Sequence, residues 1–253
     1  MTLPDESEAA DRSLKPFLDH LDDLRRAILR SLVAIALGMC VAVPLAPRLL
    51  TLLKIPLRQA GKDPDQFLRV IQVTGGISIA MSVVMWTGIL LSAPFIVFFI
   101  CQFVFPGLTD KERKAVVNSM GFAVLLFVAG VAVGYGLLLR VTLEWMFTIN
   151  DWLGVKLDFV LVNDYIGFVL KLLLAMGLTF EFPVVILALA RIGLVSHAFL
   201  AGKRRHVAVI ALIVSAIITP TVDPVSQTIF AAPLYALYEM CIWLVWGMER
   251  RRR

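Results

Sequence analysis

Charged residues are scarce in this chain of 253 residues, and apolar residues are in excess. Asp, Glu, Lys and Arg make up 17% of the sequence, against about 25% in soluble domains, and the apolar share is 59%, against about 45–50%. A water-soluble globule of this size could not bury so many apolar side chains, and a disordered chain is more polar. The composition predicts a polytopic membrane protein, in which the net charge of +5 sets orientation rather than nucleic-acid binding.

Residues that commonly perform chemistry are also few. The 3 Cys residues lie inside apolar runs, where a disulfide framework is not expected. A short motif, Gly76-Ile77-Ser78, is similar to that of intramembrane serine proteases, but His20, His197 and His206 fall on the opposite side of the predicted membrane, so no Ser–His pair can form. No phosphate loop, HExxH or paired-Cys metal motif occurs. The sequence therefore predicts neither an enzyme nor a cofactor or metal site.

Six apolar runs remain, and each is expected to be a helix because backbone polar groups in lipid must bond within their own segment. The runs are apolar on all sides, unlike the alternating strands of membrane barrels, and show no internal repeat. They cover residues 27–47, 77–105, 115–139, 165–190, 207–219 and 225–245. The predicted fold is an all-α membrane protein with six transmembrane helices in a single domain over 1–253, with a flexible tail at 1–13 and a basic tail at 247–253.

Basic residues set the predicted orientation. Sixteen of the 24 Lys and Arg residues lie in segments on the side of the N-terminus, and seven lie in the intervening loops 48–76 and 140–164. By the positive-inside rule both termini are cytoplasmic, and the two long loops, which could hold small helices or caps, are external. The fifth run has only 13 residues, which reach about 20 Å across a hydrocarbon core of about 30 Å. We expect a short fifth helix and a recessed, short sixth, unless the boundaries are wrong by a few residues.

Glu181 is the most informative single residue, because an ionisable group inside a span is costly and usually functional. Lys171 lies ten residues away on the same predicted helix, about 15 Å along its axis and on a different face, so it cannot neutralise Glu181. Glu181 is then protonated, faces a wet cavity or meets a partner, and an interhelical hydrogen bond is the structural alternative. Pro183 is expected to bend the helix and free a carbonyl group.

Two acidic residues on an otherwise basic cytoplasmic face form a second signal. Asp23 lies in an amphipathic stretch, 16–30, that is expected to rest in the membrane interface before the first span. Glu112 lies in Thr109-Asp110-Lys111-Glu112, which also reads as a capping box for the third helix. Paired carboxylates suit a ligand with paired cations, since guanidinium binds carboxylate bidentately.

The turn between the fifth and sixth helices holds Pro220 and Asp223, followed by Pro224. Asp223 could simply be the N-cap of the sixth helix, with proline at the first helical position. If the hairpin is recessed, Asp223 and Gln227 instead offer polar contacts within the membrane.

Several motifs, in order, resemble the TatC family, the multi-spanning component of the twin-arginine protein translocase. The matching stretches are Phe17 to Arg26 (FLDHLDDLRR), with His20, Leu24 and Arg25 at motif positions; Leu91 to Pro94 (LSAP); Pro106 to Leu108 with Lys111 to Arg113; Phe180 to Val184 (FEFPV), with Phe180 and Pro183; and Thr219 to Gln227 (TPTVDPVSQ). The resemblance covers about residues 14–246.

The resemblance implies the role of each residue. Asp23, where the family usually has Glu, and Glu112 would bind the arginine pair of a signal peptide. Glu181 would lie in a concave face that contacts partner transmembrane helices, Asp223 and Gln227 would contact partners, and Pro56 matches a proline of the first outer loop. The implied partners are TatA-type and TatB-type subunits, twin-arginine precursors and other TatC copies, in a bacterial cytoplasmic membrane.

The predicted function is a signal-peptide receptor and core subunit that exports folded proteins with the proton-motive force. A secondary transporter with an ion pathway through Glu181 and Lys171 is the rival, and a membrane scaffold without peptide binding is the third possibility.

Overall fold

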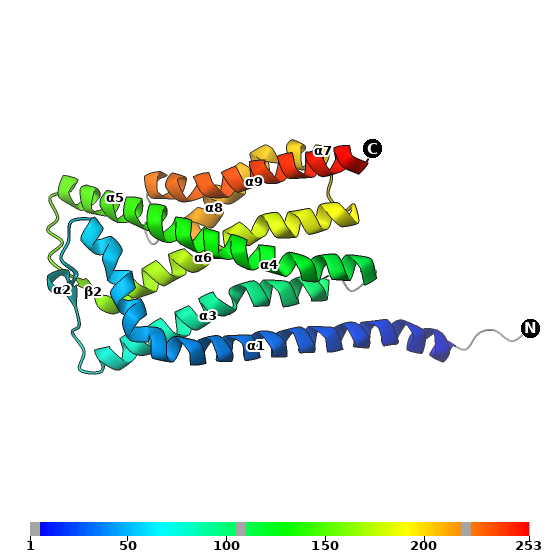
Figure 1. Cartoon of the computed structure of the whole chain (residues 1–253), viewed down its shortest axis with the longest axis horizontal. Coiled ribbons are helices and arrows are strands. Elements are labelled where there is room, and N and C mark those ends of the chain that lie inside the picture. The colour runs from blue at the N-terminus through cyan, green and yellow to red at the C-terminus, as the bar shows by residue number, and fades with distance from the viewer. Residues whose placement is uncertain (1–5, 105–109, 219–223, 253) are drawn as a thin grey trace, which may run out of the picture.

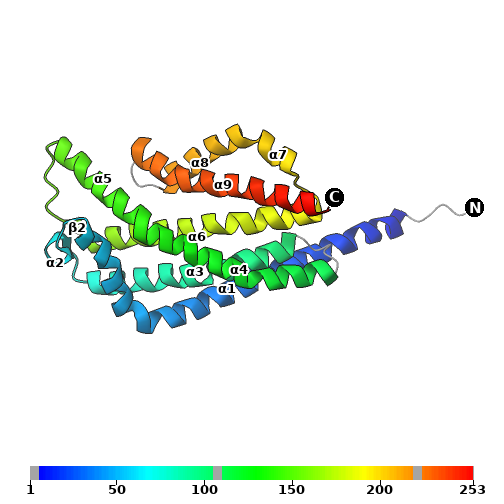
Figure 2. The ribbon, with the colours of Figure 1, turned by 45° about the horizontal axis from the view of Figure 1, so that its top comes forward.

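The structure is a computed structural model that describes residues 6–104, 110–218 and 224–252, with side chains for 21–103, 121–191, 193–217, 224, 225 and 227–250. Long helices lie alongside one another, and α1 begins at the same end of the bundle at which α9 finishes (Figures 1 and 2). The elements are α1 Glu6–Gln59, α2 Pro64–Phe67, β1 Leu68–Arg69, α3 Gly75–Val104, α4 Asp110–Val133, the π-helix η1 Gly134–Leu138, α5 Leu139–Trp152, β2 Val160–Leu161, α6 Val162–Ile192, α7 His197–Gly202, α8 Arg204–Ile218 and α9 Pro224–Arg252.

Helix α6 is the centre of the bundle, packing against α3, α4 and α9, while α1 packs on α3 and α8 on α9. Within the described residues, five helical segments are long and apolar enough to cross a membrane: 21–59, 75–103, 121–152, 162–191 and 227–250. The prediction of an all-helical membrane protein is confirmed. In the part of the chain that the structure describes, strands β1 and β2 have two residues each and pair in parallel, Leu68 with Val160 and Arg69 with Leu161.

Close backbone contact between helices depends on small residues. A Cβ atom on Gly38 of α1 would lie 2.5 Å from the carbonyl oxygen of Gly88 on α3. A Cβ atom on Gly130 of α4 would lie 2.7 Å from the carbonyl oxygen of Met176 on α6. Since lipid is as apolar as a leucine surface, membrane helices associate through this kind of close fit.

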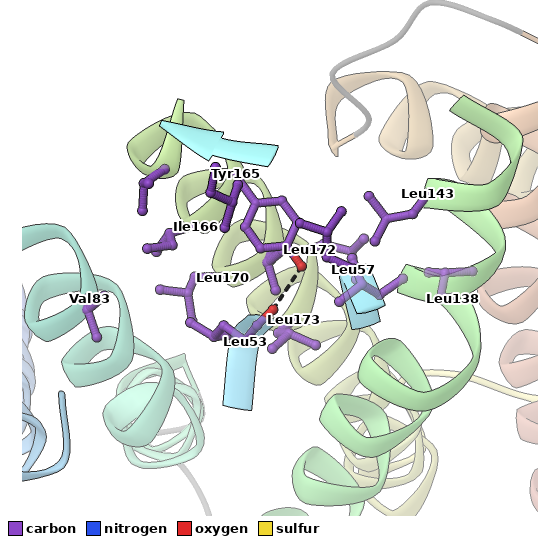
Figure 3. Close-up of a cluster of buried hydrophobic side chains, with 14 of the residues drawn as sticks. Leu53, Leu57, Val83, Leu138, Leu143, Tyr165, Ile166, Leu170, Leu172 and Leu173 are labelled. Atoms are coloured by element: carbon purple, nitrogen blue, oxygen red, sulfur yellow. Dashed lines mark hydrogen bonds between the residues drawn. The ribbon is translucent and has the colours of Figure 1, made fainter. Parts of the chain in front are cut away.

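The largest buried cluster joins the second half of α1 to α3, α5 and α6 (Figure 3). Leu57, Leu139 and Val169 are fully buried in it. The hydroxyl of Tyr165 donates a 2.8 Å hydrogen bond to the carbonyl oxygen of Leu53, which ties the start of α6 to α1 (Figure 3). This cluster fixes the end of the bundle opposite to the start of α1 (Figure 1).

The predicted span boundaries need three corrections. α1 is one helix of 54 residues, so stretch 16–30 continues into the first span and does not form a separate interfacial helix. The helix that contains the third span continues past residue 139 to Trp152, so much of the predicted outer loop is helical. The prediction of a short sixth helix is wrong, because α9 has 29 residues, whereas α8, the fifth, has 15.

The predicted tails are also partly helical. α1 begins at Glu6, inside the segment 1–13, and α9 continues to Arg252, inside the segment 247–253. The loop after α1, which was predicted to be external, does contain a small helix, α2.

Candidate functional site

The helical segments that hold the two predicted arginine-binding residues, Asp23 and Glu112, lie towards the end of the bundle where α1 begins. Asp23 and Arg25 are exposed on α1, and Leu24 between them is half-buried. Glu112 is the third residue of α4, whose first turn lies at this same end (Figure 1). The side chains of Glu112 and His20 are outside the described residues. The backbone therefore brings the two motif segments to one end of the molecule, and Asp23 is open to solvent or ligand.

Glu181 lies deep in α6, and its side chain is only 2% exposed. Neither carboxylate oxygen has a hydrogen-bond partner among the described residues. The interhelical hydrogen bond considered from the sequence is therefore not formed in that part of the chain. A buried polar group without a partner is rare in folded proteins, and this one lies in a predicted span.

The surroundings of Glu181 come from three helices. Cys101, near the end of α3, is half-buried and within electrostatic range of the carboxylate. Phe180 packs directly on Gly130 of α4, since a Cβ atom there would lie 2.7 Å from its ring. Pro183 is buried inside α6 and, lacking an N–H group, leaves the carbonyl of residue 179 without its helical donor. The motif Phe180 to Val184 on α6 thus places one acidic group between tightly packed helices.

The hairpin between α8 and α9 is only partly described. Pro220 and Asp223 lie outside the described residues, so their predicted roles have no structural test. Gln227, in the first turn of α9, donates a 2.8 Å hydrogen bond from Nε2 to the carbonyl oxygen of Leu212 on α8. Ser215 in turn donates to the backbone oxygen of Gln227 at 2.8 Å. In the single chain, Gln227 therefore joins the two helices of the hairpin.

Pro56 is buried near the end of α1 and has a structural role that the sequence did not reveal. Proline lacks an N–H group, so the carbonyl of Leu52, four residues earlier, has no helical donor. The hydroxyl of Tyr135, in the π-helix η1, donates to that oxygen at 2.7 Å. Tyr135 and Tyr165 thus bind adjacent carbonyls of α1.

An ion pair between the last turns of α1 and the short helix α2 lies at the end of the bundle where α1 finishes. Lys54 donates to Asp65 at 3.0 Å, and Arg58 lies 3.7 Å from the other carboxylate oxygen. The hydrogen bond from Lys54 holds the pKa of Asp65 below its ordinary value, and the charges of Lys54 and Arg58 act in the same direction.

The sequence pattern did not identify Glu239 as a structural residue, although an acidic side chain within an apolar run needs a cation or a hydrogen-bond donor beside it. It accepts two hydrogen bonds from Arg204, at 2.8 Å to Nε and 3.1 Å to Nη2, and a third from the hydroxyl of Tyr235 at 3.1 Å. This fork joins the start of α8 to α9. Among the described residues, no group of three His, Cys, Asp or Glu side chains could hold a metal ion.

The chain is similar to known proteins over most of its length. A family model described as "Sec-independent protein translocase protein (TatC)" matches residues 19–233. The curated protein of that name from Deinococcus radiodurans is 34% identical over 234 residues, which is 90% of this chain and 85% of the relative. The chloroplastic protein from Arabidopsis thaliana is 32% identical over 244 residues, covering 96% of this chain and 69% of the relative.

Two solved structures share the arrangement of helices. One, described as a crystal structure of the twin arginine translocase receptor TatC, superimposes with a TM-score of 0.75 at 30% identity and covers 89% of this chain and 97% of that one. A second, of the same receptor in the detergent DDM, has a TM-score of 0.77 at 30% identity, with 89% and 99% covered.

Proposed function

The chain belongs to the TatC family of Sec-independent protein translocase subunits, and from that premise we propose that it is the signal-peptide receptor and core subunit of a twin-arginine translocase. Membership of a translocase family means that the chain is a transport component and not an enzyme. The observation that carries the proposal is the family match over 19–233, which includes Asp23 and Glu112 in the two motif segments.

Recognition of the arginine pair is assigned to Asp23 and Glu112. Each guanidinium presents a planar fork of N–H donors that fits one carboxylate. Two carboxylates can therefore bind two adjacent arginines. Asp23 is exposed and available for such a contact. Its side chain is one methylene shorter than glutamate, so the arginine must approach the α1 backbone more closely. His20, Leu24 and Arg25 complete the motif around it.

The apolar part of the signal peptide is proposed to lie along a concave helix surface towards Glu181. The carboxylate of Glu181 is buried without a partner among the described residues, and we propose that it meets a polar group on a TatA-type or TatB-type transmembrane helix when neighbouring side chains move aside to expose it. Phe180 and Pro183 shape this part of α6. A hydrogen bond from the incoming helix would satisfy a group that is otherwise costly in the membrane.

The α8–α9 hairpin is proposed as a second partner contact, through Asp223 and Gln227 near Pro220. The 15 residues of α8 span about 22 Å, less than the hydrocarbon core of about 30 Å. If α8 crosses the membrane as the fifth of six spans, its shortness would thin the bilayer beside the site, where partners and further TatC copies assemble.

We also propose the finer topology: six spans in one membrane domain, with both termini cytoplasmic. That α1 begins and α9 ends at one end of the bundle supports an even number of crossings (Figure 1). The protein itself is a multi-pass membrane protein, and its relatives are bacterial and chloroplastic. A bacterial cytoplasmic membrane, with transport of folded proteins driven by the proton-motive force, completes the proposal. Nucleic acid has no part in it.

The test is binding of a twin-arginine peptide to purified protein, compared with the same peptide carrying two lysines. Glu112→Gln combined with Asp23→Asn should abolish binding of the twin-arginine peptide and leave membrane insertion intact. Asp22→Asn is the matched control, because it removes the same charge from an exposed neighbouring position on α1. Unchanged binding by the double variant would remove these residues from the proposed role.

A further inference from the structure

Lys171 is a cation within a predicted span that the proposed function does not use. It lies on α6, nine residues after Val162, and its side chain is exposed. Its ammonium group lies 5.5 Å from the centre of the Trp86 ring on α3. Among the described residues, no Asp or Glu lies within ion-pair distance of Lys171. An exposed intramembrane charge without a carboxylate partner requires an anion from outside the chain or access to the headgroup region.

Polar side chains connect Lys171 to the end of the bundle at which α3 and α6 begin. Ser82 donates a 2.8 Å hydrogen bond to Oδ1 of Asn163, and Nδ2 of Asn163 donates to Ser78 at 3.3 Å. Ser78, Ser82 and Trp86 are spaced four residues apart on α3. Asn163 and Lys171 are eight apart on α6, so each set follows one face of its helix. We call these five residues the α3–α6 polar strip.

The strip is open in its middle. Gly167 lies one turn from both Asn163 and Lys171, and a Cβ atom built on it would meet nothing within 4 Å. Asn163 and Lys171 are exposed, and Ser82 is half-buried. A group that enters from the end of the bundle therefore finds hydroxyl and amide groups first, open space above Gly167 next, and the ammonium group last.

The depth of Lys171 decides what the strip can bind. Nine residues of helix place its Cα about 14 Å from the start of α6. Side chains on a helix lean towards its N-terminus, so the long lysine side chain carries its ammonium group back towards the headgroup region. Trp86 beside it is a residue typical of that interface. The cation thus lies within reach of a lipid phosphate that settles slightly into the bilayer.

We propose that the α3–α6 polar strip is a binding site for the phosphate of an anionic phospholipid in the leaflet at which α3 and α6 begin. The ammonium group of Lys171 neutralises the phosphate, and Ser78, Ser82 and Asn163 contact the polar headgroup. An anionic lipid fits better than a zwitterionic one, since the headgroup of the latter brings its own cation next to Lys171. A carboxylate on a partner helix is the competing occupant, but it would have to be desolvated to reach the same depth.

The experiment titrates the purified full-length chain in detergent with dioleoyl phosphatidylglycerol and, separately, dioleoyl phosphatidylcholine, and counts bound lipids by native mass spectrometry. Lys171→Met should weaken the tightest phosphatidylglycerol site about tenfold or more, and Lys171→Arg should retain it, because arginine also binds phosphate. Lys203→Met is the matched control: Lys203 is exposed and its ammonium group lies 6.0 Å from the Phe199 ring, but it is outside the strip.

A second variant keeps the positive charge of Lys171 and fills the open space at Gly167. Gly167→Leu fills the open middle of the strip, favours the helix and should also weaken phosphatidylglycerol binding, so the proposal can be tested even if Lys171→Met is poorly folded. Wild-type affinity in both variants would overturn the proposal. Equal affinity for the two lipids, or displacement of the lipid by millimolar inorganic phosphate, would also overturn it. So would a co-purifying transmembrane helix that Lys171→Met releases while lipid binding is unchanged.

Discussion

Gly88→Ala should destabilise the protein although alanine is the better helix former. Gly88 lies in α3 against α1, and a Cβ atom on it would be 2.8 Å from the backbone nitrogen of Met39 and 2.9 Å from its Cα. These are backbone atoms, which no rotamer change can move. Ordinary contact begins near 3.4 Å, so the helices must separate by about 0.5 Å along an interface built on this approach.

The expected change in the free energy of unfolding of Gly88→Ala is the difference between a packing cost and a gain in helix propensity. Overpacking of this kind costs about 1–3 kcal/mol, and replacing glycine by alanine in a helix returns up to about 1 kcal/mol. We therefore expect a net loss of up to about 2 kcal/mol in the free energy of unfolding. Gly121→Ala in α4 is the control, since a Cβ atom there meets nothing within 4 Å, and it should stabilise by up to about 1 kcal/mol.

The assay is thermal unfolding of both variants in the same detergent, followed by tryptophan fluorescence and by helical circular dichroism. Opposite signs of the Tm shift confirm that α1 and α3 meet through their backbones. If Gly88→Ala raised the Tm as much as Gly121→Ala, the close approach would not exist and the reasoning about helix packing would be refuted.

Three further changes test other contacts. Tyr165→Phe removes the hydrogen bond to α1 and should cost about 0.5–1.5 kcal/mol of unfolding free energy in a denaturant titration; no loss would mean that the carbonyl finds another donor. Because the pKa of Asp65 is lower in the folded protein than in the unfolded chain, its contact with Lys54 stabilises fully above the unfolded pKa and is lost as the pH falls through the folded pKa. Asp65→Asn should therefore reduce the acid-induced drop in Tm, and an identical acid profile would contradict this. Arg204→Lys keeps the charge but loses the fork on Glu239, so protease cleavage near α8 should become faster, whereas an unchanged cleavage rate would show that the bidentate geometry is not needed.

Hydrophobic patterning predicted α3 and α6 well, because a change from apolar to charged residues marks where a helix leaves lipid. It failed for α1, whose 54 residues continue through Pro44, Pro47 and Pro56. A proline usually ends a predicted helix, but here the carbonyl freed by Pro56 is satisfied by Tyr135, about 80 residues later in the chain. Such long-range compensation has no local signature in the sequence.

For the candidate site, too, the sequence predicted some features and could not predict others. Burial of Glu181 follows from its place within an apolar run, and the structure agrees. That its carboxylate has no partner among the described residues depends on which side chains neighbouring helices present, which the sequence does not specify. Gln227 was predicted to contact partner proteins, and in the single chain its amide donates to α8, because the two helices of the hairpin lie close together.

Site-specific photocrosslinking to a twin-arginine precursor tests the central claim most directly. A photoreactive residue placed next to Glu112 should crosslink to the segment that holds the arginine pair, and one placed next to Glu181 should crosslink to the apolar segment or to a small single-span subunit. Both crosslinks should vanish when the arginine pair is replaced by two lysines. The account would be contradicted if residue 112 could be labelled only from the compartment opposite the precursor, or if neither position crosslinked to it.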